Sequence, residues 1–117
     1  MINVKDQVYT SLETVCPHAT DSYPQNWATL PAVMYVEEEN NVYEFTHQEE
    51  KSYIRYKIDI WDNKSTSQTA LEVDKAISKL GLKRTTCQDV PDPSGLKHKV
   101  MRYEGVIDVY TEQVYQY

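Results

Sequence analysis

Two pairs of cysteine and histidine residues lie close enough along the chain to suggest nucleophilic chemistry. Cys16 lies two residues before His18, and Cys87 lies eleven residues before His98. A thiol becomes an effective nucleophile when a histidine, itself oriented by a carboxylate, takes its proton. His18 falls in a proline-rich stretch, and His98 stands between two lysines with no glycine-rich oxyanion turn nearby. We therefore predict no catalytic residues and interpret both cysteines as small, half-buried apolar side chains.

The sequence also lacks the spacings that hold metals and cofactors. His18, His47 and His98 form no HxH, HxxxH or HExxH pattern. The run Glu37–Glu39 is predicted to be a solvated hairpin tip, since adjacent strand residues point to opposite faces and cannot converge on a cation. Three glycines in 117 residues provide neither GxGxxG nor GxxxxGK. We predict no metal and no cofactor.

The sequence predicts two helices. The first spans residues 4–15, with Asn3 as N-cap and Pro17 ending it. The second runs from about Ser67 to Leu80 and is stopped by Gly81 at the C′ position. Each has an apolar stripe at helical spacing, formed by Val4, Val8, Leu12 and Val15 in the first and by Ala70, Leu71, Val73, Ile77 and Leu80 in the second.

The clearest strand spans residues 51–62, and its length of twelve residues indicates a central strand. Its apolar residues (Ile54, Tyr56, Ile58 and Ile60) alternate with charged ones (Arg55, Lys57 and Asp59). Two earlier strands, 32–38 and 42–46, are expected to flank a hairpin turn at Asn40-Asn41. A short strand over 82–87 precedes a proline-rich loop. The last main strand covers 97–109, and residues 110–117 form a strand end or a tail.

These elements predict an α+β fold in the order α-β-β-β-α-β-β. A mainly antiparallel sheet with two helices packed on one face is the economical arrangement. The length predicts a single domain over residues 1–117. The longest apolar run is far shorter than the ~20 residues of a membrane helix. The N-terminus lacks the layout of a secretory signal. We expect a soluble protein that stays where it is made.

Charge is unevenly distributed along the chain. Residues 1–50 contain one basic and nine acidic residues, whereas residues 51–117 contain eleven basic and nine acidic residues. The net charge of -6 argues against free nucleic acid as the main ligand. Ten tyrosines against one phenylalanine favour half-buried sheet faces and interfaces over a dry core.

The unlike charges suggest a contact between copies of the chain. Six glutamates and no basic residue lie between Glu37 and Glu50, whereas seven basic and two acidic residues lie between Lys75 and Arg102. Complementary patches of this kind steer and register association. The alternative is two solvated faces of one small domain. The candidate interface residues are Glu37, Glu38, Glu39, Lys83, Arg84, Lys97, Lys99 and Arg102.

Several short motifs, taken in order, resemble one protein family. They are Tyr23-Pro24-Gln25-Asn26, Leu30-Pro31-Ala32-Val33, Glu37-Glu38-Glu39-Asn40, Tyr56-Lys57-Ile58-Asp59-Ile60-Trp61-Asp62, Ser65-Thr66-Ser67, Leu80-Gly81-Leu82-Lys83-Arg84, Asp89-Val90-Pro91-Asp92 and Leu96–Gly105. With the chain length and the element order, they resemble the tail-terminator, or tail-completion, proteins of long-tailed bacteriophages and of prophages in Gram-positive bacteria. The likeness spans roughly residues 4–110, and the tyrosine-rich C-terminus has no match in it.

The resemblance implies a structural virion protein without enzymatic activity. Such a protein caps the completed tail tube as a ring, usually hexameric, and joins it to the connector of the head. Its partners would be the tail-tube protein, the connector or stopper protein and further copies of itself, with phage DNA only passing through the lumen and no membrane. It would lie at the head-proximal end of the tail in the virion and in the host cytoplasm during assembly. The alternatives are a head-closure or stopper protein, a small bacterial binding module or antitoxin-like regulator and, last, an enzyme.

Overall fold

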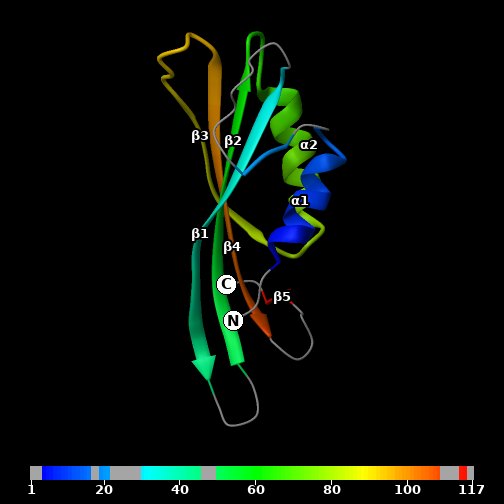
Figure 1. Cartoon of the computed structure of the whole chain (residues 1–117), viewed down its shortest axis with the longest axis vertical. Helices are drawn as coiled ribbons and strands as arrows, with labels where there is room; N and C mark the ends of the chain where they lie inside the picture. The colour runs from blue at the N-terminus through cyan, green and yellow to red at the C-terminus, as the bar shows by residue number, and fades with distance from the viewer. Residues whose placement is uncertain (1–3, 17–18, 22–29, 46–49, 109–113, 116–117) are drawn as a thin grey trace.

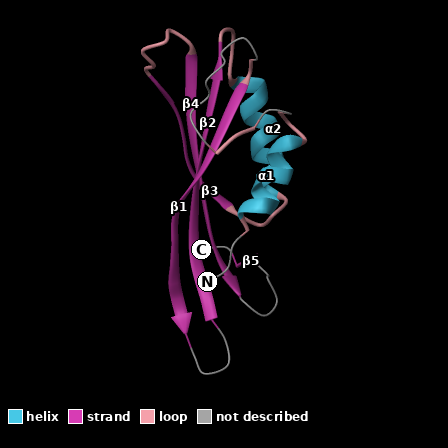
Figure 2. Ribbon diagram, in the orientation of Figure 1, coloured by secondary structure: helices cyan, strands magenta, loops and turns pink. Residues whose placement is uncertain are grey.

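The computed structural model describes residues 4–16, 19–21, 30–45, 50–108 and 114–115. The elements are α1 (Lys5–Glu13), β1 (Ala32–Phe45), β2 (Glu50–Asp62), α2 (Ser67–Ser78), β3 (Lys83–Val90), β4 (Lys97–Asp108) and β5 (Val114–Tyr115). Both helices lie on one side of a long, twisted antiparallel sheet (Figure 1, Figure 2). The predicted α+β class is therefore confirmed.

The strands follow the order β1-β2-β4-β3 across the sheet, and β5 also pairs with β4. Every one of these pairings is antiparallel. β2 was expected to be the central strand, and it lies between β1 and β4, beginning one residue earlier than predicted. In this position β2 bonds to a strand on each side and contributes side chains to both faces of the sheet.

The alternation in β2 gives the core. Its four apolar residues are fully buried, as predicted: Ile54, Tyr56, Ile58 and Ile60. They join one cluster with Val8 and Leu12 of α1 and with Val73 and Ile77 of α2. We call this side of the sheet the helix face and the opposite side the open face. Burial of this kind contributes about 25 cal/mol per Å² of apolar surface.

The helices match their apolar stripes but end earlier than predicted. α1 begins after Val4, which occupies the N-cap position expected for Asn3. Asn3 and Pro17 lie outside the described residues. α2 ends at Ser78, so Gly81, with its φ of 92°, lies one position further from the helix than predicted. Leu71 does not widen the stripe, because its side chain is 67% exposed.

The predicted turn at Asn40-Asn41 is wrong. β1 continues through both residues, with Asn40 opposite Ile54 and Asn41 opposite Tyr53, up to Phe45 opposite Glu50. Irregularities between Glu37 and Glu39 and between Val42 and Glu44 accommodate the extra residues as bulges. The two predicted strands are therefore one, and the order before β5 is α-β-β-α-β-β. Thr46, the predicted end of the second strand, is outside the described residues.

The C-terminal strands extend the sheet on its other side. β3 runs to Val90, three residues beyond its predicted end, while Leu82 precedes it as a buried residue. β4 ends at Asp108, and Val109 falls outside the described residues. Within the predicted tail, the two-residue strand β5 pairs with Val106 and Ile107 of β4.

Candidate functional site

The open face carries a cluster of opposite charges across β1, β2 and β4. The Oε1 atom of Glu38 accepts hydrogen bonds from Nε of Arg55 at 3.2 Å and from Nε of Arg102 at 3.1 Å. Nη1 of Arg55 also lies 3.8 Å from Oε2 of Glu39. The Glu38 side chain is only 21% exposed, so these contacts are partly shielded from solvent. We call these four residues the arginine cluster.

The bulge in β1 explains why two consecutive glutamates meet one guanidinium. Glu37 lies opposite Tyr56 and Glu39 lies opposite Arg55, which leaves Glu38 as the extra residue. A bulge of this type re-aims one side chain, so Glu38 and Glu39 both reach the open face. The expectation that the glutamates form a solvated hairpin tip and cannot converge is therefore wrong.

A second polar cluster lies where β2 and β4 reach the other end of the sheet. The rings of Trp61 and His98 stack with centroids 4.5 Å apart. Nε2 of His98 lies 2.8 Å from Oδ1 of Asp59, and Nδ1 lies 3.6 Å from Oδ1 of Asp92. Nε1 of Trp61 donates to the same oxygen of Asp92 at 3.1 Å. Hydrogen bonds from Ser94, above all from its hydroxyl, lower the pKa of Asp92.

This second cluster fastens the loop after β3 to the open face. Asp59 and Trp61 are each only 2% exposed. Because each ring nitrogen of His98 faces a carboxylate, neither is directed at a hydroxyl or thiol. Cys87 lies opposite Met101 on the helix face, whereas His98 lies on the open face. The sheet therefore separates the Cys87 thiol from the His98 imidazole, so these two residues do not form a nucleophile and base.

The two cysteines differ in their surroundings. The Cys16 thiol is buried and donates to the carbonyl oxygen of Pro31 at 3.2 Å. Cys87 is exposed, so the interpretation of both as half-buried apolar side chains is wrong for this residue. His18, the other candidate base, lies outside the described residues.

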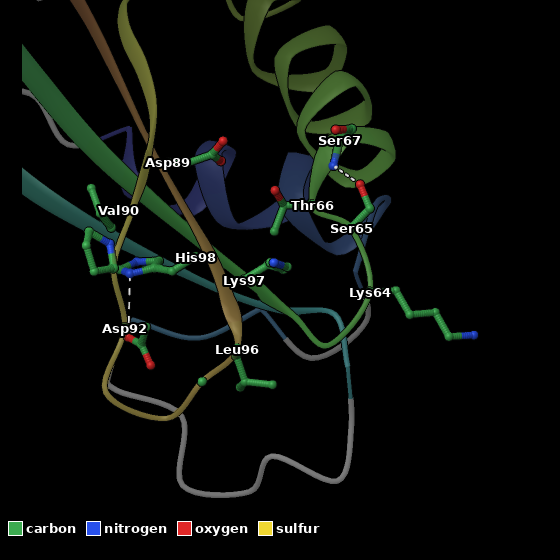
Figure 3. Close-up of a pocket in the computed structure, with 12 residues that line it drawn as sticks. Lys64, Ser65, Thr66, Ser67, Asp89, Val90, Asp92, Leu96, Lys97 and His98 are labelled. Carbon is green, nitrogen blue, oxygen red and sulfur yellow. Dashed lines mark hydrogen bonds and ion pairs between the residues drawn. The ribbon is translucent and has the colours of Figure 1, made fainter.

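A cavity of about 510 Å³ adjoins the second cluster (Figure 3). It lies between the turn before α2 and the loop from β3 to β4. Lys64 and Lys97 supply positive charge to its lining, and Asp89 and Asp92 supply negative charge. The mixture gives the cavity no dominant sign of charge, so its lining does not single out an anionic or a cationic ligand.

The predicted acidic interface residues and two of the predicted basic ones lie on opposite edges of the sheet. Glu37, Glu38 and Glu39 are on the edge strand β1, while Lys83 and Arg84 are on the edge strand β3. The register follows one row from Glu37 through Tyr56 and Tyr103 to Arg84. The next row runs from Glu39 through Arg55 and Glu104 to Lys83. The acidic and basic edges are therefore level with each other, about 14 Å apart across three strand spacings.

The other basic candidates are placed differently. Lys97 is exposed at the start of β4, and Nζ of Lys99 lies 3.1 Å from Oδ1 of Asp89. Arg102 lies within the arginine cluster, paired with Glu38 of the same chain. Nη1 of Arg84 lies 3.4 Å from Oδ2 of Asp74 on α2. Because these charges are paired within the chain, the difference in charge between residues 37–50 and residues 75–102 is smaller than the sequence suggests.

Comparison with known proteins finds no family model and no curated protein that matches this chain. Neither helix in the described ranges has the length and apolar character needed to cross a bilayer. Among the same residues, no group of three His, Cys, Asp or Glu side chains is placed to hold a metal ion.

The arginine cluster yields a stability prediction. We expect Glu38→Lys to lower the free energy of unfolding by about 1–2 kcal/mol, because it places a third cation between two half-buried arginines. Glu72→Lys makes the same change of charge at an exposed position on α2 and serves as the control. Thermal denaturation measures both, and equal melting temperatures would show that the cluster contributes little to stability.

Proposed function

We propose that this chain is a structural phage protein that closes the completed tail tube as a ring and joins the tail to the head connector. The ring is formed by head-to-tail contacts between copies, six of them in the arrangement that the family resemblance implies. The protein acts without catalysis, in the host cytoplasm during assembly and at the head-proximal end of the tail in the virion. Phage DNA passes through the lumen.

The level placement of the two charged edges carries this proposal. A ring needs heterologous contacts, in which two different surfaces of one copy meet those of its neighbours. The β1 edge offers Glu37 and Glu39, and the β3 edge offers Lys83 and Arg84 in the same two rows. Contacts at one level favour a flat, closed ring over a helical filament, since each copy is added by rotation without a rise.

The charges of the open face fit passage of DNA without tight binding. Arg55 and Arg102 are neutralised by glutamates of the same chain, and the total net charge is -6. A protein binds DNA mainly by neutralising phosphates with Lys and Arg. Basic side chains that are already paired contribute little to such binding, which would suit a channel through which DNA has to move.

The test is co-purification of the tagged full-length chain with the tail-tube protein, followed by imaging of the tube ends. We expect the protein at one end of each tube as a ring. Binding to the portal-side connector without the tube would instead assign it to the head-closure or stopper class. Failure to bind either partner would overturn the proposal.

Charge reversals test the edges that form the ring. We expect Lys83→Glu with Arg84→Glu to abolish capping while the chain remains folded, because the contact then joins two acidic edges. Glu37→Lys with Glu39→Lys in the same chain should restore part of it. Glu38 is left unchanged because it holds the arginine cluster together. Capping by the double Glu variant at the wild-type level would show that this edge is not in the contact.

A further inference from the structure

β3 is an edge strand exposed on both faces of the sheet. Seven of its eight residues are exposed, and the eighth, Val90, is intermediate. In the part of the chain that the structure describes, β4 is the strand paired with β3, so the other side of β3 borders no strand. An edge of this kind presents N–H and C=O groups that can pair with another chain. The question is which chain its side chains favour.

The side chains of β3 are arranged symmetrically about Cys87. Asp89 lies two register positions from Cys87 in one direction, opposite Lys99. Arg84 lies two register positions away in the other direction, opposite Tyr103, because the bulge at Thr85 removes one residue from the count. Arg84, Cys87 and Asp89 all lie on the helix face. Rotation by 180° about Cys87 therefore exchanges a positive position with a negative one.

We propose that β3 pairs antiparallel with β3 of a second copy about a two-fold axis at Cys87. Cys87 then faces Cys87 of the other copy, and Thr86 faces Gln88. Arg84 faces Asp89 twice, once on each side of the axis. The axis is perpendicular to the sheet, so both helical layers remain on the same side and the two sheets continue into one.

Ion pairs within each copy flank the proposed contact between Arg84 and Asp89. Arg84 contacts Asp74, and Asp89 contacts Lys99, in the same chain. Pairing would place the four in a row of alternating charge: Asp74, Arg84, then Asp89 and Lys99 of the second copy. The Asp89 side chain is 77% exposed and that of Arg84 is 48% exposed, so each can accept a second partner.

The β1 edge is less suited to full-length pairing. The backbone of Thr20 already bonds to it, through Val33 O at 3.0 Å and Tyr35 N at 2.9 Å. A strand added to β1 could extend only beyond this bridge, whereas β3 offers its full length. These observations favour a second β3 as the occupant of the β3 edge.

The pairing has one consequence that rests on the proposed function. A two-fold contact uses the same surface on both copies and cannot by itself build a ring. It also covers Arg84, one of the residues assigned to the ring contact. A chain therefore cannot use its β3 edge for the dimer and for the ring at the same time. In this proposal the dimer is the form of the chain before it assembles on a tail.

Oxidative cross-linking of the purified full-length protein tests the pairing. Directly opposed residues of antiparallel strands have Cα atoms about 4.5–5.5 Å apart, within the range of disulfides. We expect copper–phenanthroline to link Cys87 to Cys87 of a second copy, unchanged by Cys16→Ser and abolished by Cys87→Ser. Lys79→Cys in the Cys87→Ser background places an exposed thiol at the C-cap of α2. It measures random collision and should cross-link about tenfold more slowly.

Charge exchange tests the register. Arg84→Glu alone or Asp89→Lys alone places like charges opposite each other and should slow cross-linking about tenfold, whereas the double variant should restore it. Lys79→Glu makes the same change of charge as Arg84→Glu, but at the C-cap of α2, and should have no effect. Cross-linking of Cys87 no faster than the Lys79→Cys control, or no restoration by the double variant, would overturn the pairing.

The cross-linking assay contains no tail, so its outcome is separate from that of the capping assay. Rapid linkage of Cys87 by a protein that caps no tubes would retain the pairing and reject the proposed function. A protein that caps tubes but cross-links Cys87 no faster than the control would retain the proposed function and reject the pairing. If foreign strands were to occupy the β3 edge instead, Cys87 of the purified chain would cross-link no faster than the Lys79→Cys control at any concentration, which also contradicts the pairing.

Discussion

Replacing Ile58 with aspartate is expected to leave the chain unfolded. Ile58 is fully buried at the centre of β2, on the helix face, within the cluster that joins the sheet to both helices. The change removes a buried aliphatic side chain, which costs about 2–5 kcal/mol in itself. It also buries a carboxylate without a partner, which adds several kcal/mol. The sum is comparable with the total stability of a small protein, about 5–15 kcal/mol.

Val42→Asp is the matched control for this variant. It places the same side chain at an apolar residue of the sheet, but Val42 is 61% exposed on β1. We expect cooperative thermal unfolding close to that of the wild type for Val42→Asp and no cooperative transition for Ile58→Asp. Circular dichroism measures both. Similar melting curves for the two variants would contradict the register of β2.

Alkaline pH is expected to unfold the protein through its buried tyrosines. Tyr56 and Tyr103 are fully buried, and burial is the main cause that raises the pKa of each phenol. Tyr103 also donates to Oδ1 of Asp74 at 2.7 Å. Burial, with a hydrogen bond to Glu104, raises the pKa of Tyr53 to about 12. In the unfolded chain all three would ionise near pH 10.

The direction of the effect follows from these raised pKa values. The unfolded state releases its phenolic protons first, so the stabilisation is complete below about pH 10 and is lost above it. Each fully buried tyrosine contributes a loss of about 1.4 kcal/mol per pH unit. We expect unfolding to coincide with the tyrosinate absorbance of these residues. Tyr103→Phe and Tyr56→Phe should each reduce the slope of stability against pH, and an unchanged slope in both would contradict the assignment.

The strict alternation from Ile54 to Ile60 was sufficient to predict β2 and the face it buries, because the whole pattern lies within one chain segment. The length of the same segment predicted its central place. β1 was predicted as two strands because Asn40-Asn41 is typical of a tight turn. The competing factor was pairing with Ile54 and Tyr53, which keeps the asparagines in the strand while the bulges absorb the extra length. Whether bulges keep the asparagines in the strand depends on the pairing with β2, and the residues around Asn40-Asn41 do not indicate it by themselves.

The charged segments were found from composition, but their pairing could not be predicted. Glu38 and Arg102 are sixty-four residues apart and were assigned to opposite patches, yet they share a hydrogen bond across the open face. Asp59 was expected to be one of the outward charges of β2, and it is instead buried beside His98. Both arrangements require the register of β2 against β4, and the first also requires the register and bulge of β1 against β2. The sequence of one strand alone does not reveal these registers.

The direction of the four main strands has a wider consequence. Because every neighbouring pair is antiparallel, β1 and β3 run in opposite directions at the two borders of the sheet. A copy rotated about an axis along the strands would bring its β1 antiparallel to β3. A copy related by a two-fold axis through the sheet would bring its β3 antiparallel to the same strand. The polarity of the backbone thus permits both modes of association, so the choice between them rests on the side chains and is open to change by a few substitutions.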